Sequence, residues 1–229
     1  MNKRTKKHTQ NQFYGLKNGD LKHISDVKNG LKCDCICPAC NEKLVAKNGG
    51  SKRINHFSHH TNKECKYGAQ TSLHLAAKDI LNKSKRIKVP KVEIFVNKGI
   101  KIGPYGFISI GEFIEISDTF SIPIEKVILE KKLHSYIPDV VIISKGKKLI
   151  VEIAVTHFVG REKLKLIKDS KISAIEINLS HLKNDFKIDQ LEKHIVEELD
   201  YKSWLHNEIA EKQADSSRKE MRNGNKIYE

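Results

Sequence analysis

The sequence predicts an α/β protein in which a small cysteine-rich module precedes a core of order helix, three strands, helix, strand, with a further helix after it. Three observations predict this arrangement. All five cysteines lie between residues 33 and 65. Apolar residues recur at helical spacing over residues 67–85. Runs of β-branched residues, broken by Gly and Pro, then extend from about residue 89 to residue 180 and are typical of strands.

Four segments can be distinguished along the 229 residues. Residues 1–12 form a basic, polar arm, and residues 13–66 contain the cysteines and several histidines. Residues 67–187 form the α/β core. Residues 188–229 contain an amphipathic helix and a charged tail, because Leu191, Ile195, Leu199, Leu205 and Ile209 follow one another at helical spacing.

The charge balance favours a polyanionic partner. Forty-two Lys and Arg residues outnumber 28 Asp and Glu residues, which gives a net charge of +14. DNA is the partner that this charge fits best, although a lysine-rich surface that only solvates the protein explains it equally simply. The sequence has no apolar run of 18 residues and no signal-peptide pattern, so we expect no membrane partner and a cytoplasmic location.

A zinc site is predicted in the cysteine-rich module. Cys37-Pro-Ala-Cys40 has the spacing with which two thiolates wrap one zinc ion. His56, His59 and Cys65 supply the second half of the site. We expect Cys37, Cys40, His59 and Cys65 to bind a structural Zn²⁺, with His56 as the substitute ligand. Because no cysteine occurs elsewhere, a reducing compartment and a metal site fit better than a disulfide scaffold.

Two more cysteines, Cys33 and Cys35, lie just upstream of this motif and are spare in the expected site. A flexible loop with incidental cysteines is the alternative interpretation. A closed site with four protein ligands would be structural and would not by itself indicate a reaction.

A second metal site is indicated by two carboxylates in an apolar hairpin. Asp139 opens one strand after Pro138, and Glu152 interrupts the next strand beyond a turn at residues 144–148. Two carboxylates brought together in apolar surroundings repel each other unless a cation lies between them. Mg²⁺ or Mn²⁺ would therefore be held by Asp139 and Glu152. The structural alternative is that Asp139 only starts a strand and that Glu152 pairs with a lysine.

These residues resemble the PD-(D/E)xK nuclease superfamily, and the motifs around them resemble the competence-protein CoiA-like family. The resemblance spans residues 31–180. It rests on Cys37-x2-Cys40 with Leu44-Val-Ala-Lys, His56-Phe-Ser-His59, Cys65, Gln70-Thr-Ser-Leu-His74-Leu-Ala-Ala-Lys78, Glu152-Ile-Ala-Val-Thr-His157-Phe-Val-Gly-Arg-Glu-Lys163 and Ile175-Glu176-Ile-Asn-Leu-Ser180.

The resemblance implies a restriction-endonuclease-like αβββαβ core and a metal-dependent DNA nuclease of a bacterial or phage cytoplasm. Such a protein would act in DNA processing, recombination or defence against foreign DNA. Asp139 and Glu152 would hold the metal. The superfamily's lysine normally lies two residues after the Glu, where this chain has Ala154. Lys163, in the first turns of the next helix, is expected to replace it and to position the water that attacks the phosphate.

Six further residues are expected to support the site. Gln70, His74 and Lys78 are four residues apart and share one helix stripe, with Gln70 at a position where the family often has a metal-binding Glu. We expect His74, Lys78 and the basic arm to contact phosphates. The remaining supporting residues are Thr156, His157 and Glu176. Each has a plain structural alternative, such as a strand-end histidine or an ion pair.

Two other functions fit the same sequence. Ala154 and Gln70 would suit a catalytically inactive DNA-binding protein on a degenerate nuclease core. The second is a zinc-containing interaction adaptor whose positive charge is incidental. In either case the helix around Trp204 could bind a protein partner or form a homodimer.

Overall fold

The structure is a computed structural model that describes residues 11–50, 53–61, 65, 67–102, 106–133, 135–182 and 188–224. The chain divides into two compact units. The first contains residues up to Ser84 together with Ile153–Phe158 and Ile177–Tyr201, and the second contains Lys85–Glu152, Val159–Glu176 and the chain from Lys202 onward. The expected basic arm falls mostly on residues 1–10, outside the described residues.

The first unit begins with small antiparallel hairpins and continues with a helix. Strands β1 (Tyr14–Lys17) and β2 (Asp20–His23) pair with each other, as do β3 (Leu44–Lys47) and β4 (His56–His59). Short 3-10 turns lie at Ile24–Asp26 and Leu31–Cys33. Helix α1 (Gly68–Lys83) buries the apolar positions predicted for it and contacts helix α3 (Ile188–Val196).

A five-stranded sheet is the main feature of the second unit, and its strand order is β13-β12-β11-β10-β9. The bounds are β9 (Lys126–Leu129), β10 (Val140–Ser144), β11 (Lys147–Ala154), β12 (Ala174–Asn178) and β13 (Lys202–His206). The last residues of β11 and β12 belong to the first unit. Strands β9, β10 and β11 run antiparallel, and Val140 pairs with Val151.

Helix α2 (Arg161–Asp169) connects β11 to β12. Ile150 N donates to Ser173 O and Leu179 N donates to Ala154 O, so residue numbers rise together along the two strands, which are therefore parallel. Beneath α2, one core cluster joins the helix to the sheet through Tyr136, Val141, Ile150, Ile167 and Ala174. Apolar burial in this cluster fixes how α2 lies on the β10–β11 hairpin.

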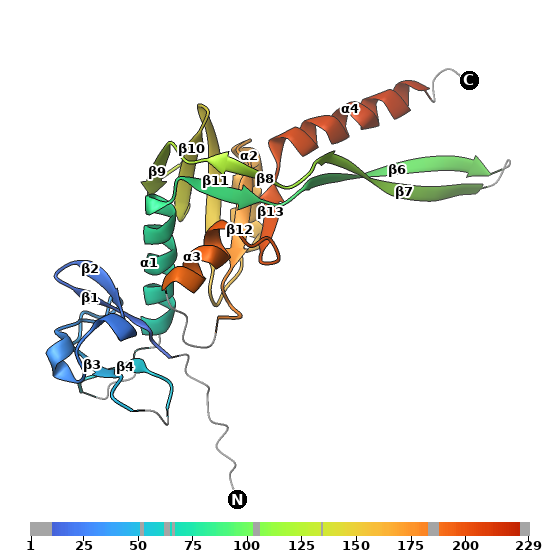
Figure 1. Ribbon diagram of the computed structural model, residues 1–229. Helices are drawn as coiled ribbons and strands as arrows, with labels where there is room; N and C mark the ends of the chain where they lie inside the picture. The colour runs from blue at the N-terminus through green and yellow to red at the C-terminus, as the bar shows by residue number, and fades with distance from the viewer. Residues whose placement is uncertain are drawn as a thin grey trace, which may run out of the picture. The chain divides into compact units, whose positions relative to one another are not determined.

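Two further strand pairs and a helix complete the second unit (Figure 1). Strand β5 (Arg86–Val89) pairs with β8 (Phe120–Pro123), and the long β6 (Val92–Ile102) pairs with β7 (Gly106–Ser117). Helix α4 (Glu208–Gly224) contacts β6.

The predicted mixed α/β architecture is confirmed. Between α1 and α2 the described part of the chain forms seven strands, β5 to β11, where the sequence-based expectation for the core was three. The single helix predicted from residue 188 is wrong, because α3 and α4 are separated by strand β13. Tyr201 O accepts a hydrogen bond from Asn178 N, next to where β13 completes the edge of the sheet. The apolar spacing that includes Leu199 and Leu205 suggested a helix, but backbone pairing with β12 places Leu205 in a strand.

No helix among the described residues combines the length and the apolar character that crossing a membrane requires.

Candidate metal centres

Four side chains of the cysteine-rich module converge on one point. The donor atoms of Cys37, Cys40, His59 and Cys65 all lie within 4.8 Å of one another. Cys40 Sγ lies 3.3 Å from His59 Nε2, and Cys37 Sγ lies 4.0 Å from Cys65 Sγ. These are the four ligands that the sequence predicts.

Local backbone structure brings the four donors together. Asn41 N donates to Cys37 O, and Cys37 N donates to Glu42 O, so the segment between the first two cysteines closes into a tight knuckle. Asn41 has a φ of 59°, a left-handed conformation that asparagine tolerates well. In the β3–β4 hairpin, Leu44 pairs with His59, which places the imidazole beside the knuckle.

The fourth ligand, Cys65, lies where the module joins helix α1. Gly68 N donates to Cys65 O at 3.4 Å. A Cβ atom on Gly68 would lie 3.3 Å from Cys37 Sγ and 2.5 Å from Gln12 Oε1. The start of α1 therefore packs directly against the cluster, where a larger residue would collide with Gln12. Gln12 itself is 5% exposed and its amide contacts Cys37 Sγ at 3.9 Å, a contact that the sequence pattern of a polar arm did not indicate.

The remaining candidates of this module stay outside the group. His56 Nδ1 lies 2.8 Å from Ile54 O. Cys33 and Cys35 are buried, and their thiols donate to the backbone oxygens of Leu44 and Cys33. Both lie outside the four-ligand group, as expected for spare cysteines, and their burial in the core is a finding of the structure.

Three thiols and one imidazole fit a tetrahedral zinc ion. Burial raises the pKa of the Cys37 thiol to about 11, and the backbone amides of Ala39 and Cys40 oppose this increase only in part. A thiolate at this position therefore requires a bound cation at neutral pH. Because all four donors come from the protein, the group is a candidate structural zinc site, and a zinc ion held by all four would have no open position for a substrate.

The second site lies on the β10–β11 hairpin of the second unit. The turn Lys145-Gly146, with φ values of 48° and 71°, closes this hairpin in the left-handed region that suits a two-residue turn. Since Val140 pairs with Val151, Asp139 lies opposite Glu152 one residue further along the ladder. The structure thus brings the two predicted carboxylates together.

Glu152 is almost fully buried and pairs with the predicted lysine. Lys163 Nζ lies 2.6 Å from Glu152 Oε2, and the two side chains are 34% and 3% exposed. The other oxygen, Glu152 Oε1, is buried without a hydrogen-bond partner among the described residues. A buried carboxylate oxygen without a hydrogen-bond partner costs free energy, because it has lost its contacts with water. A bound cation would offset this cost.

Burial raises the pKa of Glu152 to about 7. The Lys163 ammonium lowers this pKa through its hydrogen bond and charge, and the Asp139 carboxylate raises it. Perturbation by burial together with a specific charged neighbour is typical of functional carboxylates, although structural ion pairs also show it.

Glu176 holds the connection that carries Lys163. Glu176 Oε1 accepts a 2.7 Å hydrogen bond from Val159 N, and Glu176 is 8% exposed on β12. Gly160 is the N-cap of α2, so Lys163 lies in the first turn of that helix. Glu176 therefore anchors the backbone immediately before the turn from which Lys163 reaches Glu152.

The other predicted supporting residues belong to the first unit. Gln70 and His74 are partly buried on α1, and Lys78 on the same helix is 7% exposed. Thr156 Oγ1 lies 2.8 Å from His157 Nδ1, and both residues are exposed.

The fold and the two sites define a mixed α/β protein with an N-terminal module built around a four-ligand metal group. Residues 16–68 match the family model described as Competence protein CoiA, N-terminal domain. This match includes all four candidate ligands and confirms the resemblance to the CoiA-like family over the N-terminal part of the chain. Neither the curated proteins nor the solved structures gave a match to the chain.

Proposed function

We propose that this protein is a metal-dependent DNA nuclease with a structural zinc module. The observation that carries the proposal is Glu152: a carboxylate buried in a strand, paired with Lys163 on one oxygen and without a hydrogen-bond partner on the other. Asp139 lies beside it, so two carboxylates and a lysine meet at one end of a hairpin.

The order of elements supports the proposal. Strands β9, β10 and β11 are antiparallel, and α2 and the parallel strand β12 follow them, as in the βββαβ part of the PD-(D/E)xK order that the sequence resembles; β5 to β8 lie between α1 and this part. The usual lysine position is occupied by Ala154, which is buried. Lys163, on helix α2, places its ammonium 2.6 Å from Glu152 Oε2. It would thus replace the lysine that the superfamily carries two residues after the Glu on the same strand.

Asp139 and Glu152 are the residues that would hold Mg²⁺ or Mn²⁺. The bound ion would supply Lewis-acid polarisation of a phosphate oxygen and stabilise the charge that develops there. Lys163 would orient the attacking water and offer a positive charge to the phosphate. DNA fits the net charge of +14. The CoiA-like resemblance suggests DNA processing, recombination or defence.

The test is cleavage of linear and circular, single- and double-stranded DNA by purified, zinc-loaded protein with Mg²⁺, with Mn²⁺ or with neither ion added. We expect cleavage with either divalent ion and none without them, while the zinc content stays at one equivalent in all three conditions. Salt-sensitive DNA binding without cleavage under any of these conditions would contradict the proposal and favour the inactive DNA-binding protein. Absence of both cleavage and binding would favour the interaction adaptor.

Replacing Lys163 should weaken the site without unfolding the chain. Lys163→Met removes the ammonium that lowers the pKa of Glu152, so this pKa should rise further. We expect cleavage at pH 7 to fall by about 10²-fold and the rate to need a higher pH for its maximum. Lys165→Met, an exposed lysine on the same helix, is the matched control. Equal activity of the two variants would show that Lys163 is a solvated lysine.

The raised pKa of Glu152 also predicts a pH dependence of stability in the absence of divalent ions. A carboxyl group whose pKa is raised by folding binds its proton more tightly in the folded state. Its contribution to the free energy of unfolding is therefore fully present below the ordinary pKa of 4.5 and is lost as the pH rises through about 7. The excess of the Tm of the native protein over that of Glu152→Gln should shrink as the pH rises from 5 to 8, measured on zinc-loaded protein in buffer without added divalent ions. A difference that is independent of pH would contradict the assignment.

A further inference from the structure

Strands β6 and β7 form a long ribbon that lacks a third strand. Their register runs from Val92 opposite Ser117 to Ile102 opposite Gly106, and no other strand of the described residues pairs with either. Helix α4 contacts β6, whereas the outer edge of β7 stays open (Figure 1). Two-stranded ribbons are marginally stable in water, and open edges of this length are templates for pairing with another chain.

The ribbon also exposes an aromatic pair. Phe113 is 71% exposed and Phe95 is 56% exposed, and their ring centroids lie 5.1 Å apart on opposite strands. Ile114, the next residue on β7, is 39% exposed. Gly111 lies beneath the Phe95 ring, because a Cβ atom there would come within 1.8 Å of it. The Phe95–Phe113 pair is thus a contiguous exposed apolar surface on one face of the ribbon, whereas Ile114, which pairs with Ile94, points to the other face.

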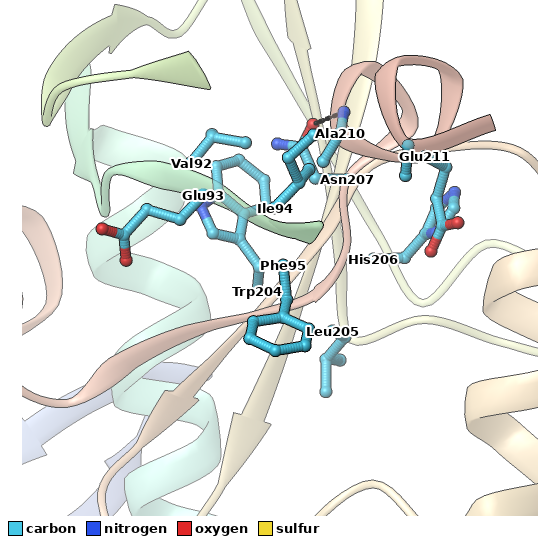
Figure 2. A pocket seen from close by; sticks show the side chains of 11 residues that line it. Val92, Glu93, Ile94, Phe95, Trp204, Leu205, His206, Asn207, Ala210 and Glu211 are labelled. Atoms are coloured by element: carbon cyan, nitrogen blue, oxygen red, sulfur yellow. Dashed lines mark hydrogen bonds between the residues drawn. The ribbon is translucent and has the colours of Figure 1, made fainter. Parts of the chain in front are cut away.

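A pocket of about 290 Å³ lies at the base of the ribbon, between β6, the end of β13 and the first turns of α4 (Figure 2). Phe95, Trp204 and Leu205 are among its lining residues. The Trp204 indole is held by hydrogen bonds from Nε1 to Pro90 O and Lys91 O, at 3.1 and 3.2 Å. The aromatic pair thus adjoins a recess with a fixed wall that could receive an apolar side chain.

The charge balance of the ribbon differs from that of the rest of the chain. Residues 92–117 contain two lysines and three glutamates, in a protein whose net charge is +14. Glu93, Glu112 and Glu115 are exposed close to the aromatic pair. A nucleic-acid backbone would be repelled by these carboxylates, so this surface suits a protein partner.

A second copy of the chain fits best among protein partners. Two copies with a net charge of +14 repel each other least where there is no excess of positive charge, and the ribbon, with two lysines and three glutamates, is such a place. A twofold axis would let the open edge of one β7 pair with the same edge of the other, since an antiparallel pair of identical strands is self-complementary. Aromatic side chains in the centre of such an interface are the usual carriers of affinity.

We propose that the β6–β7 ribbon is a homodimerisation arm, which joins two copies through the open edge of β7 and the Phe95–Phe113 surface. This inference does not depend on the nuclease proposal. It also differs from the sequence-based expectation of a dimer through the C-terminal helix, because the exposed Phe95–Phe113 pair lies on the ribbon, whereas the described part of α4 exposes one large apolar residue, Ile209.

Sedimentation equilibrium of the full-length, zinc-loaded protein tests the proposal. We expect a mass near twice 26.2 kDa at about 50 µM. Phe95→Thr/Phe113→Thr, which replaces the aromatic rings with a residue that also favours strands, should weaken dimerisation by at least about 100-fold. Phe120→Thr, which changes a similarly exposed aromatic residue on β8, is the matched control and should dimerise normally. A native protein that is monomeric at about 100 µM would overturn the proposal.

Hydrogen exchange of the native protein provides a test without any variant. The backbone amides of residues 106–117 should exchange more slowly at 50 µM than at 0.5 µM, because only the dimer pairs the edge of β7. Exchange that does not depend on concentration would overturn the proposal. Protection at 0.5 µM on addition of a short DNA duplex, without protection by concentration alone, would likewise overturn it and assign the ribbon to DNA.

Discussion

Glu152→Gln should abolish metal-dependent cleavage while the protein stays folded. Gln keeps the size of the side chain and a hydrogen-bond acceptor for Lys163, but it lacks the negative charge that would hold a divalent ion beside Asp139. Stabilisation of a phosphate transition state by such an ion amounts to several kcal/mol, which corresponds to a rate loss on the order of 10³-fold. Asp139→Asn should lower the cleavage rate by a similar factor, because both carboxylates would hold the same divalent ion.

A matched control variant shows whether the loss of cleavage in Glu152→Gln is specific to that carboxylate. Glu162→Gln removes an exposed carboxylate from the first turn of α2, next to Lys163, and should leave cleavage within about twofold of the native rate. Rates in Mg²⁺ and Mn²⁺, circular dichroism and zinc content are measured on all variants. Cleavage by Glu152→Gln at the native rate would show that the activity comes from another site or from a contaminating nuclease.

Removal of zinc should unfold the N-terminal module. Cys37→Ser and Cys65→Ser each take one thiolate from the four-ligand group, and zinc content should fall from one equivalent per chain to nearly none. Binding free energies of structural zinc are on the order of 10 kcal/mol at neutral pH, more than a module of this size gains from its apolar contacts. Hydrogen exchange over residues 30–61 should then accelerate by several orders of magnitude.

Cys33→Ser is the matched control for this experiment. Its thiol is equally buried but donates to Leu44 O, a contact that a serine hydroxyl can also make. This variant should keep one equivalent of zinc and protected amides in the module. Loss of zinc in Cys33→Ser, or retention of a full equivalent in Cys37→Ser, would contradict the assignment of the ligands.

The candidate sites differ in how far the sequence alone reaches. Cys37 and Cys40 are predictable because a two-residue spacing fits a zinc knuckle whatever surrounds it. The choice of His59 over His56 follows from the pairing of Leu44 with His59, which depends on the register of a hairpin. Similarly, Asp139 and Glu152 are recognisable as unusual residues in apolar strands, whereas the burial of Glu152 and its contact with Lys163 follow from how α2 packs on the sheet.

The C-terminal region shows where periodicity misleads. Leu191 and Ile195 do lie on helix α3, but Leu205 lies in strand β13, which completes the edge of the sheet. Apolar residues three, four or six positions apart cannot distinguish one long helix from a helix, a strand and a second helix. Residues 202–206 form a strand because they pair with β12, which lies more than 20 residues earlier in the chain. A local apolar pattern carries no information about such a partner.

The sequence by itself determined the α/β class, the candidate zinc ligands Cys37, Cys40 and Cys65 with one histidine from the pair His56 and His59, and the carboxylates that suggest a nuclease. These features are local: they depend on spacing, on side-chain chemistry and on alternation along a strand. Tertiary structure alone decided that Lys163 meets Glu152, that residues 202–206 form a strand, and that the β6–β7 ribbon stands without a third strand. Each of these depends on contacts between distant segments, and such contacts are selected by the apolar surface that the whole chain buries together.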